Sequence, residues 1–256
     1  MNKIILGDKI ETNIDDNIKI NITDKYDDVK KITIDVVSDA SITFVFNKKQ
    51  KLDINLNVKK NKKCNVFEYK VDEKYKLQYS YNLEENSYLN VIKINDVKKT
   101  KELMLFNLNG KGSKVDYLLK TIAKKSEKYC LMVYHNDKNT VSNIINHGVN
   151  IKEGEIKFDV SGFVPKGISG CTVNQDNRII NLTDEKCEIK PNLFIDENDV
   201  IASHSAHIGK CNDDKIFYLQ TRGISKKEAE MLLIKGFLTS KLDDTETMKK
   251  IIDKYW

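Results

Sequence analysis

The sequence predicts a mainly β protein that ends in two short helices. Apolar and polar residues alternate with a period of two over most of the first 220 residues, and turn-forming residues separate the alternating runs. Strict alternation puts every second side chain on one face of a strand, so each run predicts a strand with one buried face. Many short strands without intervening helices are typical of a sandwich, a barrel or a β-solenoid, and periodicity does not choose among the three.

The strands are expected in chain order where Ile, Val, Leu and aromatic residues alternate with polar ones. The regular runs are 18–22, 32–36, 42–46, 52–58 and 77–83, and the shorter ones are 115–119, 131–133 and 156–160. The segments between later runs, at 107–114, 136–139 and 152–155, are rich in Asn, Asp, Lys and Gly. These residues favour turns because they bond their own backbone or tolerate positive φ. A hairpin turn is expected at Gly110 and Gly112.

The period changes to that of a helix near the C-terminus. Ser225 and Glu228 form a capping-box pattern, and Gly236 is a suitable helix end, which predicts a helix over 225–235. Its apolar face consists of Ala229, Leu232, Leu233 and Phe237. A second helix is predicted over 244–255, with Met248, Ile251, Ile252 and Tyr255 on one face.

Composition limits the function classes. Apolar residues make up 40% of the 256 residues, yet no apolar run approaches the roughly 20 residues of a membrane span, so we expect a cytoplasmic protein without membrane contact. The net charge is +5, but Arg178 and Arg222 are the only arginines, and lysines are interleaved with Asp, Glu and Asn. A mixed, solvated surface is expected, and no nucleic-acid groove.

The chain has five scattered cysteines and no CxxC, which in a cytosolic protein favours reduced thiols. It contains no GxSxG, no GxxxxGK[ST] and no helix-opening GxGxxG, so no hydrolase or nucleotide site is predicted. His135 and His147 are isolated and are expected to be structural.

Three potential metal ligands lie close together in His204-x2-His207-x3-Cys211. Imidazole and thiolate suit Zn²⁺, Fe²⁺ and iron–sulfur clusters. A closed zinc site needs a fourth ligand, and none is adjacent. The spacing therefore leaves two interpretations open: a metal site, or ordinary residues of a turn.

Residues 190–238 read KPNLFIDENDVIASHSAHIGKCNDDKIFYLQTRGISKKEAEMLLIKGFL. This order of motifs resembles the core of the SufB/SufD family, the scaffold proteins of SUF iron–sulfur cluster assembly. The similar parts are Lys190-Pro191, the Ser203-His204 turn that ends at Gly209, a Phe217-Tyr218-Leu219 strand with a turn at Arg222-Gly223, and a helix ending near Phe237. Before about residue 100 the similarity is only architectural.

The resemblance implies a right-handed parallel β-helix over 1–220, followed by a helical segment over 221–256. In the family this segment docks the SufC-like ABC ATPase, so Ala229, Leu232, Leu233 and Phe237 are the expected partner-binding residues. The β-helices of the family pair into dimers, which implies a second SufB/SufD-like chain, identical or different. Relative to full-length members, we expect a short form without their long N-terminal helical segment.

The resemblance also suggests ligands for a transient iron–sulfur cluster at the dimer interface. His204 matches the family's histidine, and Cys187 lies near a SufB-type cysteine. Ala202 stands where SufD-type members have a cysteine, and Ser205 where SufB-type members have a glutamate; the SufB-type assembly cysteine aligns near Arg178. His207 and Cys211 are additional ligand candidates.

The expected function is therefore that of a scaffold without turnover of its own. A cysteine desulfurase or sulfur carrier would be the sulfur-supplying partner. The alternative is a structural subunit that pairs with a cluster-bearing SufB-like chain and binds no iron. The depleted ligand set favours this alternative. A carbohydrate-active β-helix enzyme would need a groove of carboxylates and aromatics, which the sequence does not predict.

Overall fold

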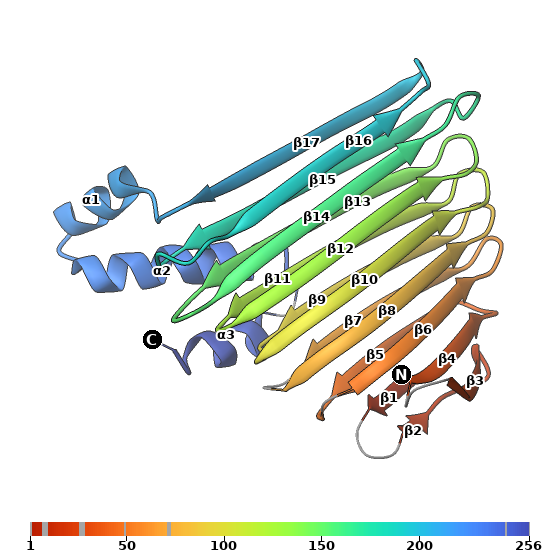
Figure 1. Ribbon diagram of the computed structural model, residues 1–256, viewed down its shortest axis with the longest axis horizontal. Coiled ribbons are helices and arrows are strands. Elements are labelled where there is room, and N and C mark those ends of the chain that lie inside the picture. The colour runs from red at the N-terminus through yellow and green to blue at the C-terminus, as the bar shows by residue number, and fades with distance from the viewer. Residues whose placement is uncertain are drawn as a thin grey trace.

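The computed structural model describes residues 2–6, 10–25, 29–48, 50–70, 73–243 and 245–255. The chain forms a β-solenoid of about six turns, followed by three short helices (Figure 1). The strands are β1 (Asn2–Leu6), β2 (Ile10–Asn13), β3 (Ile18–Lys25), β4 (Val29–Val36), β5 (Ala40–Phe46), β6 (Gln50–Val58), β7 (Lys63–Lys70), β8 (Lys74–Leu83), β9 (Tyr88–Asn95), β10 (Lys99–Leu108), β11 (Lys114–Ala123), β12 (Ser126–His135), β13 (Val141–Asn150), β14 (Glu155–Val164), β15 (Cys171–Asn181), β16 (Glu188–Ile195) and β17 (Val200–Gly209). The helices are α1 (Asp213–Thr221), α2 (Lys226–Thr239) and α3 (Glu246–Ile252).

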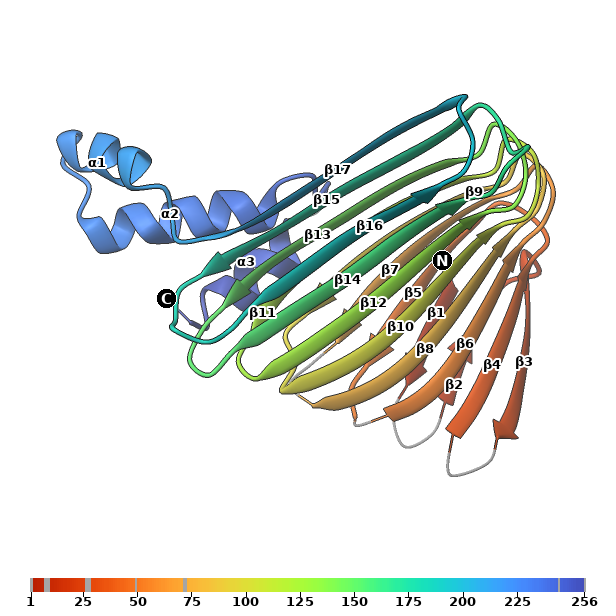
Figure 2. The same cartoon turned by 45° about the horizontal axis from the view of Figure 1, so that its top comes forward.

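Two sheets face each other, and from β4 onward the chain passes from one to the other with each successive strand (Figure 2). The nine-stranded sheet has the order β17-β15-β13-β11-β9-β7-β5-β1-β2, and the eight-stranded sheet has the order β16-β14-β12-β10-β8-β6-β4-β3. Two strand pairs are antiparallel, β1–β2 and β3–β4. All other neighbouring strands in the two sheets are parallel. The expected parallel β-solenoid is confirmed, and the sandwich and barrel are excluded.

The inward positions of the two sheets form one continuous core. It contains almost every apolar residue of the predicted alternating runs, including fully buried Phe44, Tyr81 and Phe106. The rings of Tyr81 and Phe106 stack with centroids 4.8 Å apart. Burial of each large apolar side chain stabilises the fold by about 1.5–3 kcal/mol.

The turns stack as tightly as the strands. At Gly110, an added Cβ would lie 2.0 Å from the backbone nitrogen of Glu85, in the turn of the previous coil. Only glycine allows this approach of two backbones. The hairpin expected at Gly110 and Gly112 is wrong, because β10 and β11, which this turn joins, belong to different sheets.

Charged side chains interrupt the apolar core between β7 and β10. Glu68, Lys70, Lys93 and Glu102 are fully buried. The ammonium nitrogen of Lys93 lies 3.2 Å from Glu68 and 2.9 Å from Glu102, and that of Lys70 lies 3.1 Å from Glu102. Burial alone would raise the pKa of Glu102, but the charges of Lys70 and Lys93 lower it to about 2.

The helices differ from the prediction in two respects. Residues 213–221 form a helix and not the expected strand, because the Asn212 side chain caps the amide of Lys215 at 2.9 Å and Asp213 and Asp214 occupy the first turn. Helix α2 continues through Gly236 to Thr239. The expected start of the last helix, residue 244, lies outside the described residues. Within the described ranges no helix has the length and apolar character needed to cross a membrane.

Candidate functional site

Strand β17 is an exposed edge of the solenoid at the end where the predicted ligands lie. It borders the nine-stranded sheet, and β16 borders the other sheet. Almost every residue of β17 is exposed, including Ile201 at 72% and Ile208 at 41%, and Phe194 on β16 is 55% exposed. A ten-residue edge strand presents a row of unpaired N–H and C=O groups to a partner strand. The predicted exposed edge is therefore present.

The two predicted histidine ligands lie on opposite faces of β17. His204 pairs with Gln175, a buried inward position of β15, whereas His207 pairs with Arg178, an outward position. Side chains of a strand alternate between faces, so residues three apart diverge. Placing His204 and His207 in a turn was wrong, and the HxxH spacing cannot direct both imidazoles to one ion.

The two candidate cysteines are packed into hydrophobic clusters of the fold. Cys187 lies just before β16 and packs against the solenoid core, and Cys211 is buried against α2. Burial raises the pKa of both thiols, and the carboxylates of Glu230 and Asp213 add to the effect at Cys211. Thiols are weak ligands until they ionise. Among the described residues, no group of three His, Cys, Asp or Glu side chains is arranged to hold a metal ion.

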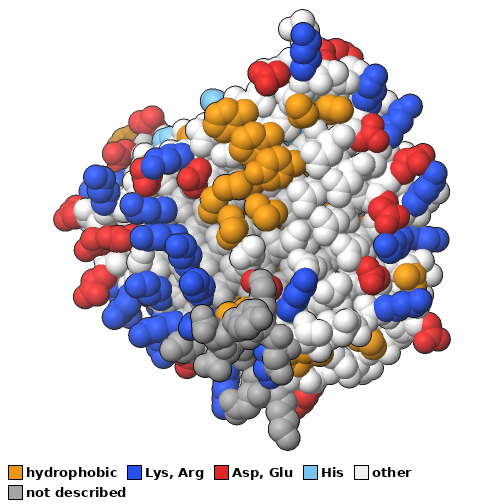
Figure 3. Space-filling model, turned by 45° about the vertical axis from the view of Figure 1, so that its right-hand side comes forward, with side chains coloured by type: hydrophobic (Ala, Val, Ile, Leu, Met, Phe, Trp, Pro, Cys, Tyr) orange, Lys and Arg blue, Asp and Glu red, His pale blue; other side chains and the backbone are white. Residues whose placement is uncertain are grey.

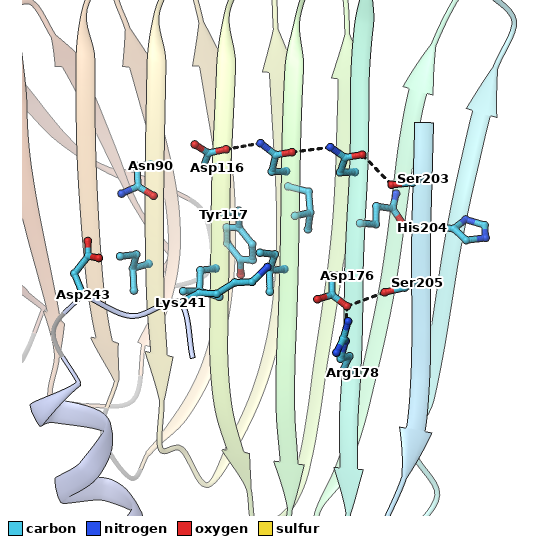
Figure 4. Close-up of a pocket in the computed structure, with 17 residues that line it drawn as sticks. Asn90, Asp116, Tyr117, Asp176, Arg178, Ser203, His204, Ser205, Lys241 and Asp243 are labelled. Carbon is cyan, nitrogen blue, oxygen red and sulfur yellow. Dashed lines mark hydrogen bonds and ion pairs between the residues drawn. The ribbon is translucent and has the colours of Figure 1, made fainter. Parts of the chain in front are cut away.

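A groove of about 750 Å³ lies beside β17 on the outer face of the nine-stranded sheet. A ladder of side chains crosses its floor: Asn143 donates to Asp116 at 2.7 Å, Asn174 to Asn143 at 2.9 Å, and Ser203 to Asn174 at 2.8 Å. His204 also borders this groove. In Figure 4, Ser203 and Ser205 point into the groove, whereas the imidazole of His204 points away from them.

A second chain of polar contacts ties the edge strand to α2. The Ser205 hydroxyl and the Arg178 Nε each donate a hydrogen bond to Asp176 Oδ1, both at 2.7 Å. Asp176 Oδ2 lies 3.3 Å from His147 Nε2, and His147 Nδ1 lies 2.8 Å from the Lys120 ammonium. An ammonium has only donors, so Nδ1 accepts and the imidazole proton is on Nε2, facing Asp176.

Lys120 completes this chain at the end of α2. Its ammonium also donates to the Phe237 carbonyl and to Ser240 Oγ, both at 3.1 Å. A cation at a helix C-terminus satisfies free carbonyls and opposes the negative end of the helix dipole. Burial, with a smaller effect from the Lys241 charge, lowers the pKa of Lys120 to about 7. The pKa of His147 is lowered to about 4, mainly by burial and to a smaller extent by the charge of Lys120.

His135 and His147 are structural, as predicted. The two ring nitrogens of His135 lie 2.7 Å from Thr140 Oγ1 and 2.9 Å from Ser142 Oγ. Burial lowers the pKa of His135 to about 4. Both histidines are therefore neutral parts of the interior and of the α2 contact.

The predicted docking face of α2 is divided between the solenoid and solvent. Ala229 is fully buried, and Leu233 and Phe237 pack into the cluster between helices and sheet. Leu232 is 50% exposed, so it alone of the four presents much surface. Phe217 and Tyr218 of α1 are more exposed, at 69% and 57%. Sequence reasoning missed these two because their segment was expected to be a strand; the Asn212-Asp213-Asp214 run was the helix-start signal.

The Lys120–His147–Asp176 chain was also missed. Lys120 and His147 occupy outward positions of their strands and would be solvated if α2 did not cover them. No local pattern indicates which outward face a later helix will cover. Only the pairing of Lys120 with His147 across β11 and β13 brings them together.

Comparisons with known proteins agree with this architecture. Residues 24–237 match the family described as "SUF system FeS cluster assembly, SufBD core domain". The chain is 33% identical over 135 residues to the iron–sulfur cluster assembly protein SufD of Bacillus subtilis (strain 168), covering 52% of this chain and 31% of that protein. It is 37% identical over 68 residues to SufD of Escherichia coli (strain K12), covering 25% of this chain and 16% of that protein.

A third relative is the iron–sulfur cluster assembly SufBD family protein ycf24 of Galdieria sulphuraria. It is 28% identical over 145 residues, which cover 54% of this chain and 63% of that protein. Each alignment spans less than two thirds of the relative's own length. The family match covers most of the chain and coincides with the solenoid and its first helices. The chain belongs to the SufBD family of SUF-system iron–sulfur cluster assembly proteins.

Proposed function

We propose that this chain is a scaffold subunit of a SUF-type iron–sulfur cluster assembly complex. It pairs through β17 with a SufB/SufD-like chain, binds a SufC-like ABC ATPase through its helices, and assists cluster assembly or transfer without turnover of its own. The observation that carries this proposal is the exposed β17 edge with its apolar residues Ile201 and Ile208. Two such edges can join into one continuous sheet by backbone hydrogen bonds.

The edge contact is tested by the mass of the particle in solution. Ile201→Lys should shift a dimer toward monomer in light scattering, both alone and with a SufB-like partner, because it places a charge in the new sheet. Ile22→Lys is the matched control: Ile22 is 41% exposed on β3, which borders the eight-stranded sheet at the other end. Equal effects of the two substitutions, or none from Ile201→Lys, would contradict the β17 interface.

Iron and sulfide are cargo in this proposal. His204 lies on the edge strand, so two chains joined at β17 would each bring an imidazole to the same interface. This explains why one chain needs no complete ligand set. The test is anaerobic reconstitution with iron and sulfide, followed by iron analysis and visible absorption. His204→Ala should lower iron loading, whereas His207→Ala, on the opposite face of the same strand, should not.

Cys211→Ala and Cys187→Ala test the remaining candidate ligands. Their buried thiols have raised pKa values, so we expect both variants to load as the wild type does. Unchanged loading in His204→Ala would remove the proposed ligand role.

The divergence of His204 and His207 also favours a second candidate function. The chain could be a structural partner that completes a cluster-bearing heterodimer and binds no iron itself. An assembled complex with a SufB-like chain that loads iron equally with wild type and His204→Ala would support this function.

The ATPase contact is proposed on the exposed residues Phe217, Tyr218 and Leu232. They are the large apolar side chains of α1 and α2 that the structure leaves at least half exposed. Substituting all three by alanine should abolish copurification with a SufC-like ATPase. Phe194→Ala is the control, since Phe194 is 55% exposed on β16. Retained binding in the triple variant would contradict this docking surface.

A further inference from the structure

Five lysines form a straight row across the outer face of the eight-stranded sheet. They are exact neighbours in register on five consecutive parallel strands, β6 to β14: Lys51, Lys76, Lys101, Lys128 and Lys157. We call this row the lysine ladder. Figure 3 shows Lys and Arg side chains gathered on one side of this face, beside a patch of hydrophobic side chains.

The ladder is poorly neutralised. Of its five members, only Lys157 has an ion pair within the described chain, with Glu188 at 3.3 Å at the end of the row. Lys74 and Lys99 add two more exposed charges beside Lys76 and Lys101. Like charges directly opposite each other on neighbouring strands destabilise a sheet. The row therefore costs stability in the isolated chain, and an anionic partner would remove that cost.

The surface beside the ladder is hollowed and partly apolar. Two shallow depressions of about 230 Å³ and 390 Å³ adjoin it. Lys51, Lys76 and Lys101 border the first depression. Half-buried Leu103 and Cys130 line the second, next to Lys101 and Lys128, and the carboxylates of Asp159 and Glu188 line it as well. A partner that fits this surface has a row of carboxylates with apolar side chains beside it.

The spacing of the ladder is closer to the turn of an α-helix than to the repeat of an extended peptide. Neighbouring strands lie about 4.8 Å apart, so the Cα atoms of the five lysines span roughly 19 Å. A helix laid along the row presents one side-chain position per turn of about 5.4 Å, whereas an extended peptide repeats on one face only every 6.6 Å or so. Nucleic-acid phosphates would meet no arginine here, since Arg178 and Arg222 lie elsewhere. We propose that the lysine ladder docks an acidic amphipathic helix of a partner protein.

The test uses a fluorescent helical peptide of about four turns, held by lactam bridges, with one glutamate per turn on one face. Its binding is measured by fluorescence anisotropy at several salt concentrations. The triple variant Lys76→Gln/Lys101→Gln/Lys128→Gln should bind roughly tenfold more weakly, with a shallower salt dependence. Its thermal stability should be equal to or above that of the wild type, because like-charge contacts are removed.

The matched control is Lys111→Gln/Lys138→Gln/Lys166→Gln, which removes the same charge from three exposed turns at the other ends of the strands. It should bind the peptide as the wild type does. A peptide of the same composition with its glutamates spread around the helix should bind several-fold more weakly than the one-faced peptide. Equal binding of the two peptides, or equal effects of the two triple variants, would overturn the proposal.

Single-stranded DNA and vesicles containing phosphatidylserine serve as competing probes. If either probe binds more tightly than the peptide, and if the ladder variant loses this binding, the surface belongs to that ligand and the helix assignment is overturned. This test is independent of the scaffold function, since it involves neither β17 nor the helices α1 and α2.

Discussion

The imidazole of His147 stacks on the ring of Phe237 with centroids 4.7 Å apart and planes 20° apart. This contact joins β13 of the solenoid to α2, and Lys120 binds the carbonyl of the same phenylalanine. A single residue of α2 thus makes both an aromatic and a polar contact with the sheet. Phe237 is therefore one of the residues that hold α2 against the sheet.

Phe237→Ala should lower the free energy of unfolding by about 2–3 kcal/mol, because it removes a partly buried aromatic from the helix–sheet cluster. Urea unfolding measures this change, and limited proteolysis should cut the α2 region faster. Leu232→Ala, at a 50% exposed position of the same helix, should cost less than about 1 kcal/mol. Equal costs for the two variants would show that Phe237 does not anchor α2.

Acid should destabilise the protein as pH falls from 6.5 to about 4. Burial lowers the pKa of His135 and His147 from 6.5 to about 4, so in this window the unfolded chain binds more protons than the folded one. Each histidine contributes up to about 3 kcal/mol to the free energy of unfolding, and this contribution is fully present above pH 6.5 and is lost as pH falls toward 4. The lowered pKa of Lys120 makes stability depend on pH only between about 7 and 10.5, so it does not add to this acid limb.

His147→Gln should flatten this acid limb, as measured by urea unfolding at half-unit pH steps. An acid limb that is equally steep in wild type and His147→Gln would disprove the assignment.

Glu127→Gln should stabilise the protein at pH 8 by about 1–3 kcal/mol. The carboxyl is fully buried, one of its oxygens has no hydrogen-bond partner, and burial raises its pKa to about 7. Such a group favours the fold when protonated, and its contribution is lost as pH rises from 4.5 through 7. The gain should therefore shrink at pH 5. A loss of stability at both pH values would refute this account of Glu127.

Glu102→Gln should cost about 3–5 kcal/mol at pH 7, because it leaves Lys70 and Lys93 buried with one carboxylate between them. Glu84→Gln breaks the ion pair with Lys59, whose partners are nearly half exposed, and should cost no more than about 1 kcal/mol. Chemical denaturation of the two variants compares a buried charge network with a surface pair. Similar costs would mean that the interior network is better hydrated than its burial indicates.

The strands were predictable because alternation is a local property. Runs such as 52–58 and 77–83 became strands with their apolar residues inward. The capping box at Ser225 also formed as predicted, with the Glu228 side chain accepting from the Ser225 amide at 3.0 Å. The helix at 213–221 was missed because the resemblance suggested a strand there, although the local capping signal pointed to a helix.

The site was only partly predictable. The position of His204 on an exposed edge followed from the resemblance, and its ligand role remains a prediction. The short spacing of His204 and His207 suggested that both could bind one metal ion, but in a strand the two side chains lie on opposite faces. The lysine ladder was invisible in the sequence, because its members are roughly one solenoid coil apart and were assigned to a mixed, solvated surface.

By itself, then, the sequence determined which residues alternate, where the chain turns and where α2 begins, since these depend on neighbours along the chain. Only the tertiary structure decided which distant residues became neighbours. Parallel stacking brought Lys120 to His147, Lys101 to Lys128 and Glu68 to Lys93. The physical reason is register: which residues pair across strands is fixed by how whole coils pack and by the lengths of the turns between them, not by any local pattern.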